Sequence, residues 1–445
     1  MANGYLYRSG ANSSASGTTA TVSMWVRKHD ESPGDGGLFQ FFTDGSNFCS
    51  AYANPVLKFR NFISGGYSQG DITCNRKLKD CGSWYHLQFV WDTSNSTAAD
   101  RMRIYVNGVR ETSFSGSTNP SSSYSFSPVV SGTFYLNRYN ANSTTGSQSY
   151  SHVHYCDGYA YEPTVFGSTD TGTGEWKINA SPTCNYGSNG FFILKDGSST
   201  TDQSGNSKTF TTSGTLTNTE DCPSNVFNTI NVLNPQVSGM TIANGNLSLT
   251  AQSDNNWRTT YGTLAASSGK FYWEQKVTAS SGSSHQIGIS DQDENRSANS
   301  NDFENANVSA YGYRGDGGKL TSVSGSTVLT ASAGDSFTNG DIIGVAMDLD
   351  NQKLYFSKNG TWQASGDPTS GSTGTGSFFN ITAGKFYTPA SPQYNSSSSF
   401  QYNFGNGFFG TTAISSEGTN ASNIGKFEYD VPTGYTALST KGLNE

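Results

Sequence analysis

Residues 84–92 of this 445-residue chain read WYHLQFVWD, and residues 102–113 read MRIYVNGVRETS. In the first stretch aromatic or aliphatic side chains recur at every second position from Tyr85 to Trp91. This is the period of a β-strand with one buried face. In the second stretch Asn107-Gly108 separates two short strand-like runs, and Asn-Gly suits a hairpin whose two central residues need positive φ. Together the stretches predict antiparallel strands.

The same alternation continues along the chain, and Asn359-Gly360 marks a second turn of the same kind. No sustained period of 3.6 residues is visible, so we expect few helices. Residues 340–348 are apolar on both faces, as in a strand inside a sandwich. The further strands that we expect cover residues 19–28, 134–137, 155–162, 270–277, 286–290, 310–313, 353–357, 386–389 and 400–404.

The composition supports a folded, all-β protein. Charged residues make up only 13% of the chain, against about 25% in an ordinary globular domain. Disordered chains are poor in aromatic residues, whereas this chain has 27 Phe, 24 Tyr and 7 Trp. Aromatic side chains suit half-buried pleated surfaces, and the 51 Gly suit turns.

The net charge of −8 argues against several function classes. Phosphate contacts need clustered Lys and Arg, so we expect no binding to nucleic acid. The same balance disfavours an anionic membrane surface, and no apolar run reaches the roughly 18 residues of a membrane span. The first residues lack a basic stretch followed by an apolar one, so we expect no signal peptide and synthesis in a cytoplasm.

Six cysteines stand at positions 49, 74, 81, 156, 184 and 222, without a CxxC pair. Cys74 and Cys81 are close enough in sequence to staple a hairpin. In a large protein made in a cytoplasm, however, free thiols are the default.

Two blocks of short strands separated by a loop-rich stretch predict two antiparallel jelly-roll β-sandwiches. We expect the first sandwich at residues 1–177 and the second at 241–412. Residues 178–240 read as a loop-rich connector packed on the first domain. Residues 413–445 are too apolar for a free tail and read as an ordered C-terminal segment.

The second block resembles a SPRY domain. The resemblance implies a bent β-sandwich that binds partners through loops and carries no catalytic residues. It rests on motifs whose order and spacing agree over about 150 residues: Phe271-Tyr272-Trp273-Glu274, Ile287-Gly288-Ile289, Tyr311-Gly312-Tyr313, Gly340-Asp341-Ile342-Ile343-Gly344-Val345 and Leu354-Tyr355-Phe356-Ser357-Lys358-Asn359-Gly360.

The first block resembles a laminin-G or concanavalin-A-like lectin domain. This resemblance implies the sandwich fold more strongly than any one ligand, since members bind sugars or proteins. It rests on Trp84-Tyr85-His86-Leu87, Phe89-Val90-Trp91-Asp92, Arg103-Ile104-Tyr105-Val106-Asn107-Gly108, Gly158-Tyr159 and Glu162.

Both blocks together resemble structural proteins of tailed phages, particularly of marine hosts. Residues 186–191, 202–210, 221–225 and 427–438 are similar to the connector and the ending of such proteins. The resemblance implies a virion component, either a capsid-bound decoration or fibre, or a tail-associated host-recognition protein. Its expected partners are other capsid or tail proteins and a host-surface glycan or protein, and we expect a homo-oligomer.

Sugar binding is the favoured ligand hypothesis, because exposed aromatic rings stack on sugars while polar side chains bond hydroxyls. The residues that we expect in loops at such a surface are Trp257, Arg258, Tyr261, Arg314 and Trp362. Packing of both tryptophans in a core or rim is the alternative.

No cofactor is expected, although calcium is possible because lectin relatives sometimes bind it through Asp, Asn and backbone oxygens. The candidate ligands are Asp44, Asn47, Asp92 and Asn95. His152 and His154 beside Asp157 have a zinc-like spacing, but ordinary histidines on a partly exposed hairpin are the favoured interpretation.

We expect no enzyme. A glycosidase needs two facing carboxylates, about 5 Å apart in retaining enzymes. Asp291 and Asp293 are spaced suitably but read as a solvated loop, and Asp157 and Glu162 are five residues apart on one expected strand. Two alternatives to an adhesion protein stay open. One is a virion polysaccharide depolymerase with Asp293 as an essential acid, and the other is an intracellular SPRY adaptor that binds peptides.

Overall fold

The computed structural model describes most of the chain, as follows: residues 4–9, 15–29, 37–53, 56–139, 145–195, 199–234, 239–251, 257–279, 285–292, 303, 309–323, 326–394 and 398–445. It divides into two compact units, one of Met1–Asn218 with Cys222–Ser224, the other of Thr219–Asp221 with Asn225–Glu445. Among the described residues, no helix has the length and apolar character needed to cross a membrane.

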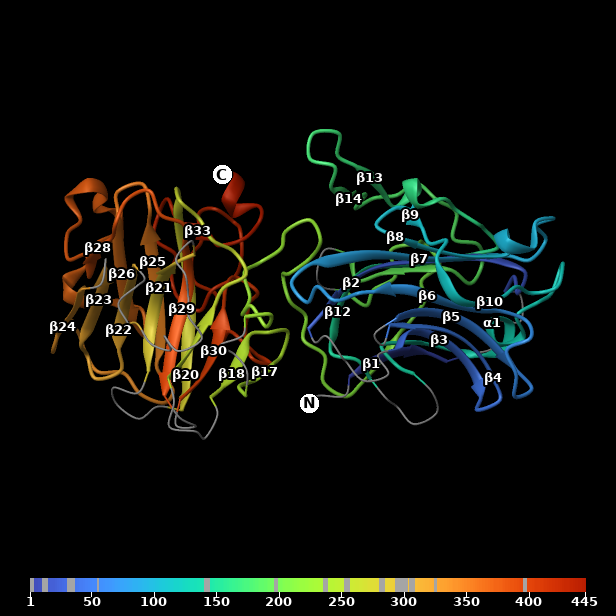
Figure 1. The fold of residues 1–445 in the computed structure, drawn as a ribbon, viewed down its shortest axis with the longest axis horizontal. Coiled ribbons are helices and arrows are strands. Elements are labelled where there is room, and N and C mark those ends of the chain that lie inside the picture. The colour runs from blue at the N-terminus through green and yellow to red at the C-terminus, as the bar shows by residue number, and fades with distance from the viewer. Residues whose placement is uncertain are drawn as a thin grey trace. The chain divides into compact units, whose positions relative to one another are not determined.

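The first unit contains an eight-stranded and a six-stranded antiparallel sheet, seen as two layers in Figure 1. The larger sheet has the order β10 (Phe114–Thr118), β6 (Asp71–Lys77), β5 (Val56–Ile63), β4 (Asn47–Ala53), β3 (Gly37–Asp44), β11 (Thr133–Leu136), β1 (Tyr5–Arg8) and β16 (Thr211–Ser213). The smaller sheet has the order β15 (Phe191–Ile193), β12 (Gln148–Asp157), β2 (Thr19–Lys28), β7 (Trp84–Asp92), β8 (Met102–Val106) and β9 (Val109–Arg110).

Side chains that alternate along these strands meet between the two layers. Phe39 and Phe41 of β3 pack edge to face against Phe89 and Trp91 of β7, and all four are fully buried. Burial of such rings is the main stabilising contribution to a sandwich of this kind. Short elements complete the unit: η1 (Ala98–Asp100), α1 (Ser127–Ser131), η2 (Pro163–Val165) and the hairpin of β13 (Gly167–Thr169) and β14 (Trp176–Ile178).

The stretch 178–240, treated above as a connector, supplies edge strands to both sheets of the first unit. Phe191–Ile193 pairs with β12, and Thr211–Ser213 pairs with β1.

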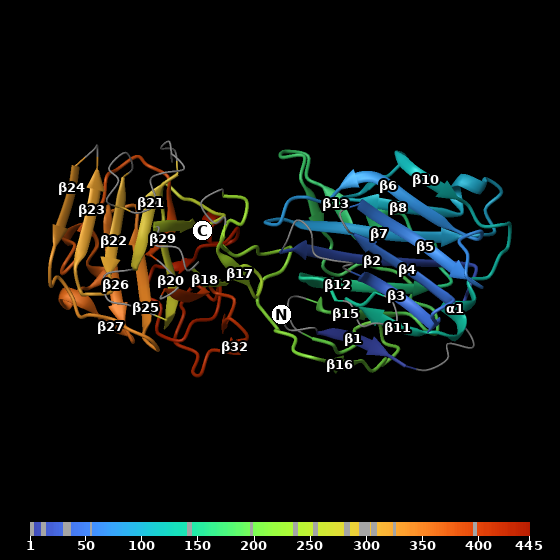
Figure 2. The same cartoon turned by 60° about the horizontal axis from the view of Figure 1, so that its bottom comes forward.

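The second unit is also a sandwich of two sheets, whose smaller sheet is spread out in Figure 2. The larger sheet has the order β17 (Thr241–Ala243), β18 (Ser248–Thr250), β30 (Ser399–Asn403), β20 (Lys270–Ala279), β25 (Ile342–Asp348), β26 (Lys353–Lys358) and β27 (Thr361–Trp362), with β28 (Phe379–Asn380) beside β26 and β33 (Thr436–Ala437) beside β20. The smaller sheet has the order β19 (Trp257–Tyr261), β29 (Tyr387–Tyr394), β21 (Gln286–Asp291), β22 (Ala310–Arg314), β23 (Lys319–Val323) and β24 (Ser326–Thr330). The remaining elements are β31 (Phe408–Phe409), β32 (Thr412–Ala413), η6 (Gln363–Ser365), η7 (Pro368–Thr373) and η8 (Gly442–Asn444).

The C-terminal residues pack on the outer face of the larger sheet. β33 pairs in parallel with β20, and Phe427 contacts Tyr272 at a centroid distance of 5.1 Å. Beneath them the buried Glu274 carboxylate accepts hydrogen bonds from the backbone N–H groups of Glu428 (2.9 Å) and Tyr429 (2.8 Å).

The prediction of an all-β protein with two antiparallel sandwiches is confirmed. Both expected Asn-Gly turns have positive φ at each residue, 48° and 76° at Asn107-Gly108 and 48° and 81° at Asn359-Gly360. The strand expected at 155–162 instead spans Gln148–Asp157 and ends before Gly158, whose φ of 85° leaves the extended region.

Candidate functional site

The outer face of the eight-stranded sheet carries one row of cross-strand neighbours. Because side chains alternate along a strand, the row faces away from the core that Phe39 and Phe41 enter. In the order of the strands the row is Tyr7, Tyr135, Gln40, Ser50, Arg60 and Asp71.

At one end of the row an aromatic cluster surrounds Arg138. Its guanidinium carbon lies 4.1 Å from the ring centroid of Tyr135 and 5.2 Å from that of Tyr5. Tyr7 stacks against Tyr135 at 5.9 Å. A cation over an aromatic face is stabilised by the ring quadrupole, which orders these side chains.

At the other end a second cluster surrounds Arg60. The guanidinium carbon lies 4.7 Å from the centroid of Tyr67 and 5.3 Å from that of Tyr52, and Tyr52 contacts Tyr139 at 4.6 Å. The Arg60 Nε donates to Asp71 Oδ1 at 2.9 Å. Both clusters thus combine a guanidinium with several phenol rings.

Gln40 and Ser50 lie between the clusters as a directly opposed pair. Both side chains are fully buried, yet among the described residues the Gln40 Nε2 and Oε1 and the Ser50 Oγ have no hydrogen-bond partner. Leaving such a group unsatisfied costs about 1–3 kcal/mol. We call the two clusters with this pair the tyrosine face.

The tyrosine face is mainly a neutral and cationic surface. Burial raises the pKa of Tyr52 and of Tyr67, so both phenols keep their protons and can donate hydrogen bonds at neutral pH. Lys58 also lies 5.4 Å from the Tyr52 centroid. Three basic side chains therefore stand on this surface beside Asp71, a combination suited to polar ligands with flat faces.

The outer face of the six-stranded sheet is covered by residues 158–190, here called the covering segment. Trp176 Nε1 donates to His86 Nδ1 at 3.1 Å, and Phe166 contacts His154 at 5.0 Å. The expectation of partly exposed histidines on a hairpin is wrong, since His152 and His154 are only 1% and 2% exposed. Among the described residues no group of three His, Cys, Asp or Glu is arranged to hold a metal ion.

The residues expected to form a sugar-binding surface lie in strands of the second unit, not in loops. Trp257, Arg258 and Arg314 stand at one end of the smaller sheet, with β29 and β21 between β19 and β22. Tyr261 is 5% exposed and packs with Ala390, whereas Trp362 lies in the other sheet and contacts Tyr272. The structure thus places three of the five residues at the same end of the smaller sheet, and their role in binding stays a prediction.

The calcium candidates occupy two turns closed by their own hydrogen bonds. Asn47 Nδ2 donates to both carboxylate oxygens of Asp44, at 3.0 and 3.1 Å. Asp92 Oδ1 accepts from the Ser94 backbone N–H (3.2 Å), and Asn95 Oδ1 accepts from the Thr97 N–H (2.9 Å). Calcium binding at these residues remains a prediction.

The carboxylates considered for catalysis have structural partners. Glu162 accepts from Arg103 Nη1 (2.9 Å) and Tyr105 Oη (3.1 Å), and it lies beyond β12 rather than on a strand. Asp157 accepts from the Ser16 N–H and from Asn189 Nδ2. Buried Asp291 pairs with Lys385 Nζ at 2.8 Å. Asp293 and Glu294 lie outside the described residues.

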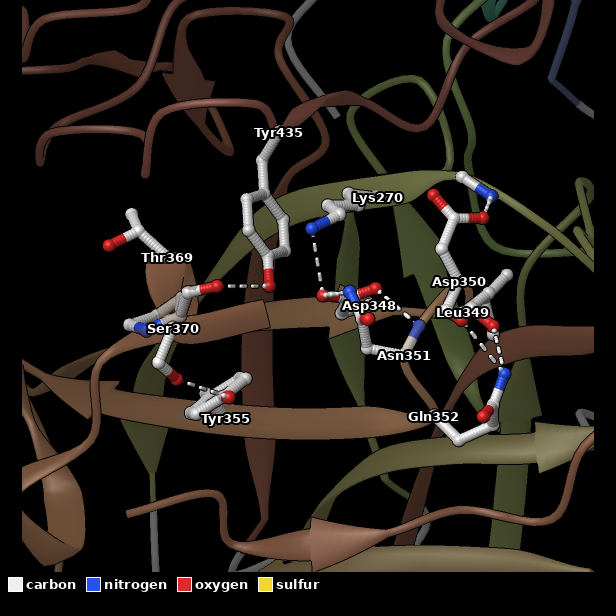
Figure 3. A network of polar contacts seen from close by, with 12 residues as sticks. Lys270, Asp348, Leu349, Asp350, Asn351, Gln352, Tyr355, Thr369, Ser370 and Tyr435 are labelled. Carbon is white, nitrogen blue, oxygen red and sulfur yellow. Dashed lines mark hydrogen bonds and ion pairs between the residues drawn. The ribbon is translucent and has the colours of Figure 1, made fainter. Parts of the chain in front are cut away.

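Figure 3 shows a second polar network, at the ends of β20 and β25 in the second unit. The buried Asp348 carboxylate accepts from Lys270 Nζ (3.0 Å) and from the backbone N–H (2.9 Å) and Nδ2 (2.8 Å) of Asn351. Tyr435 Oη donates to the Pro368 carbonyl at 3.1 Å. The carboxylate is satisfied internally, so this network holds the sheet and the C-terminal residues together.

Comparison with known proteins detects two domain types. The concanavalin A-like lectin/glucanases superfamily matches residues 2–147, and the SPRY domain family matches residues 270–406. Lectin-like and SPRY domains are binding domains, so the chain combines two modules of the binding and adhesion type. A search of curated proteins gives no significant match.

Solved structures similar to parts of the chain include two SPRY domains and one pentraxin. The SPRY domain of human HERC1 is 21% identical over 37% of this chain and 91% of its own, with a TM-score of 0.27. The TRIM65 PSpry domain is 11% identical over 40% and 91%, with a TM-score of 0.28. The heptameric SAP-like pentraxin of Limulus polyphemus is 18% identical over 34% and 69%, with a TM-score of 0.26.

Proposed function

We propose that this chain is a non-enzymatic adhesion protein that binds glycans through the tyrosine face of its first unit. The observation that carries the proposal is the pair of tyrosine–arginine clusters, in which Arg138 lies over Tyr135 and Arg60 over Tyr67 on one outer sheet face. Phenol rings stack on the apolar faces of sugars, and the two partly exposed guanidinium groups offer hydrogen bonds to sugar oxygens.

A stacking site needs no catalytic acid, which agrees with the internal pairing of Asp157, Glu162 and Asp291. A bound polysaccharide is therefore expected to stay intact during long incubation. Release of oligosaccharides would instead support the depolymerase alternative.

The binding test compares variants of the full chain on immobilised host-surface polysaccharide. Tyr135→Ala and Arg138→Ala are each expected to weaken binding about 10-fold, because each removes a stacking or charged contact worth about 1–2 kcal/mol. Tyr159→Ala removes an exposed tyrosine of the covering segment and serves as the matched control. Unchanged binding by both tyrosine-face variants would contradict the proposal.

We further propose that the protein is a virion component, made in a host cytoplasm and carried on a particle as a homo-oligomer. This proposal rests on the resemblance of the connector and the C-terminal stretch to phage structural proteins. Mass spectrometry of purified particles is expected to find the chain at many copies. Its absence from the particles would overturn the virion proposal without affecting the glycan site.

A further inference from the structure

Cys156 and Cys184 bring their sulfur atoms to within 4.0 Å of each other. Cys156 is buried in β12, and Cys184 is half-buried in the covering segment. Hydrogen bonds frame the pair, since the Asp157 N–H donates to the Tyr186 carbonyl at 3.1 Å and the Asn185 N–H to Tyr161 Oη at 2.8 Å. A disulfide has an S–S length of about 2.0 Å, so a shift of about 2 Å joins the sulfurs.

The two sulfurs are chemically unequal. The Cys156 thiol donates a hydrogen bond to the Cys184 sulfur, which lowers the pKa of Cys184 to about 7. The same hydrogen bond and burial raise the pKa of Cys156. The lowered pKa favours the thiolate form of Cys184, which is also the more exposed of the two sulfurs, as a nucleophile must be, while Cys156 keeps its proton.

We propose that Cys184 and Cys156 form a covalent modification site for small disulfides, at which Cys184 reacts first and Cys156 completes an internal cystine. The Cys184 thiolate attacks one sulfur of the disulfide R–S–S–R, forms a mixed disulfide and releases R–S⁻. The Cys156 thiol then gives its proton to R–S⁻, and its sulfur attacks Cys184 and releases the second R–S⁻, which takes a proton from solvent. The two thiols lose two electrons, which reduce the small disulfide to two thiols.

The cystine ties the covering segment to the sheet that it covers. In the reduced protein the segment is held by side-chain contacts such as those of Trp176 and Phe166 with the buried histidines. The new bond closes the loop from Cys156 to Cys184. It thereby lowers the conformational entropy of the unfolded chain and stabilises the folded unit. The tyrosine face lies on the other sheet, so glycan binding is expected to be independent of this reaction.

The test incubates the full-length chain with oxidised glutathione at neutral pH and then counts thiols in denaturant. The six thiols are expected to fall by two, to four, and a non-reducing peptide map should link the Cys156 and Cys184 peptides. Retention of six thiols, or a cross-link between other cysteines, would overturn the proposal.

Single substitutions separate the two roles. Cys156→Ser is expected to trap one glutathione on Cys184, whereas Cys184→Ser should form neither adduct nor cross-link. Cys222→Ser is the matched control and should still form the cystine. Loss of two thiols from Cys184→Ser would contradict the assignment, and this variant at a half-buried position tests the proposal even if Cys156→Ser does not fold.

Discussion

The two outer faces of the first sandwich carry similar side chains but differ in what covers them. On the six-stranded sheet, His86 bonds Ser23 Oγ (2.8 Å) and Trp176, and the covering segment hides the face. Among the described residues, buried polar atoms without a partner occur on both faces, at Gln40 and Ser50 of the eight-stranded sheet and at Trp84 Nε1 and Gln88 Oε1 of the six-stranded sheet. On the eight-stranded sheet Tyr7, Tyr135 and Arg138 stay partly exposed. Aromatic residues on a sheet surface therefore serve as core where the chain covers them, and as a candidate binding surface where their rings stay partly exposed.

The largest expected effect comes from breaking the covered face. Phe166→Ala removes a ring that is 2% exposed and contacts His154, and it should destabilise the first unit by about 3 kcal/mol. Tyr135→Ala on the tyrosine face should cost less than about 1 kcal/mol. Urea denaturation measures the free energy of unfolding of both variants, and hydrogen exchange of β7 reports the loss of protection on the six-stranded sheet. Equal losses of stability would mean that the two faces contribute equally to the fold.

A second covered face, in the second unit, extends the comparison. Glu274→Gln should destabilise that unit by about 2 kcal/mol, because the new amide nitrogen faces N–H donors instead of accepting from them. Burial raises the pKa of Glu274 to about 7, above the ordinary 4.5, so the wild-type unit should lose stability as pH rises from 4.5 through 7. Urea midpoints across this range measure the effect, and a variant that keeps the wild-type slope would contradict it.

Acid should weaken the covered face of the first unit. Burial lowers the pKa of His86 to about 3, below the ordinary 6.5, so the unfolded chain binds the proton more tightly. Stability is then complete above pH 6.5 and falls as pH drops toward 3, by at most about 1.4 kcal/mol per pH unit for this residue. His86→Gln should flatten the slope of urea midpoints against pH, and an unchanged slope would exclude His86 as its source.

The smallest expected effect concerns the buried Gln40 of the tyrosine face. Gln40→Met replaces a buried, unsatisfied amide with an apolar chain of similar size, so the first unit should gain about 1 kcal/mol in stability while glycan affinity stays unchanged. Thermal unfolding and the polysaccharide assay measure the two quantities. A loss of stability would show that Gln40 has a structural partner, and a loss of affinity would contradict the assignment of binding to the exposed rings.

Strands with one apolar face could be predicted from the sequence, and the tyrosine face was missed. Residues 84–92 and 102–106 match β7 and β8 because their alternation is clean. In β3 the aromatic residues Phe41 and Phe42 point to opposite faces, which hides the period. Val56–Ile63 does alternate, with Lys58 and Arg60 facing outward, and this was a usable signal.

The pairing of Gln40 with Ser50, of Gln40 with Tyr135 and of Ser50 with Arg60 depends on register between separate strands. Periodicity within one strand does not contain that information. The proximity of Cys156 and Cys184 could not be predicted for the same reason, because it arises only when the covering segment folds back on the sheet.

The placement of β33 has a consequence for the order of synthesis. One edge of β20 pairs with β25, whereas the other edge pairs with β30 and β33, which are made much later. This second edge stays unpaired while the intervening chain emerges from the ribosome. Pairings between distant segments form slowly, and unpaired edges can join the wrong chain in the meantime. The second unit therefore depends on residues 399–437 to pair the second edge of its central strand, and a chain that lacks them should aggregate rather than form a smaller folded domain.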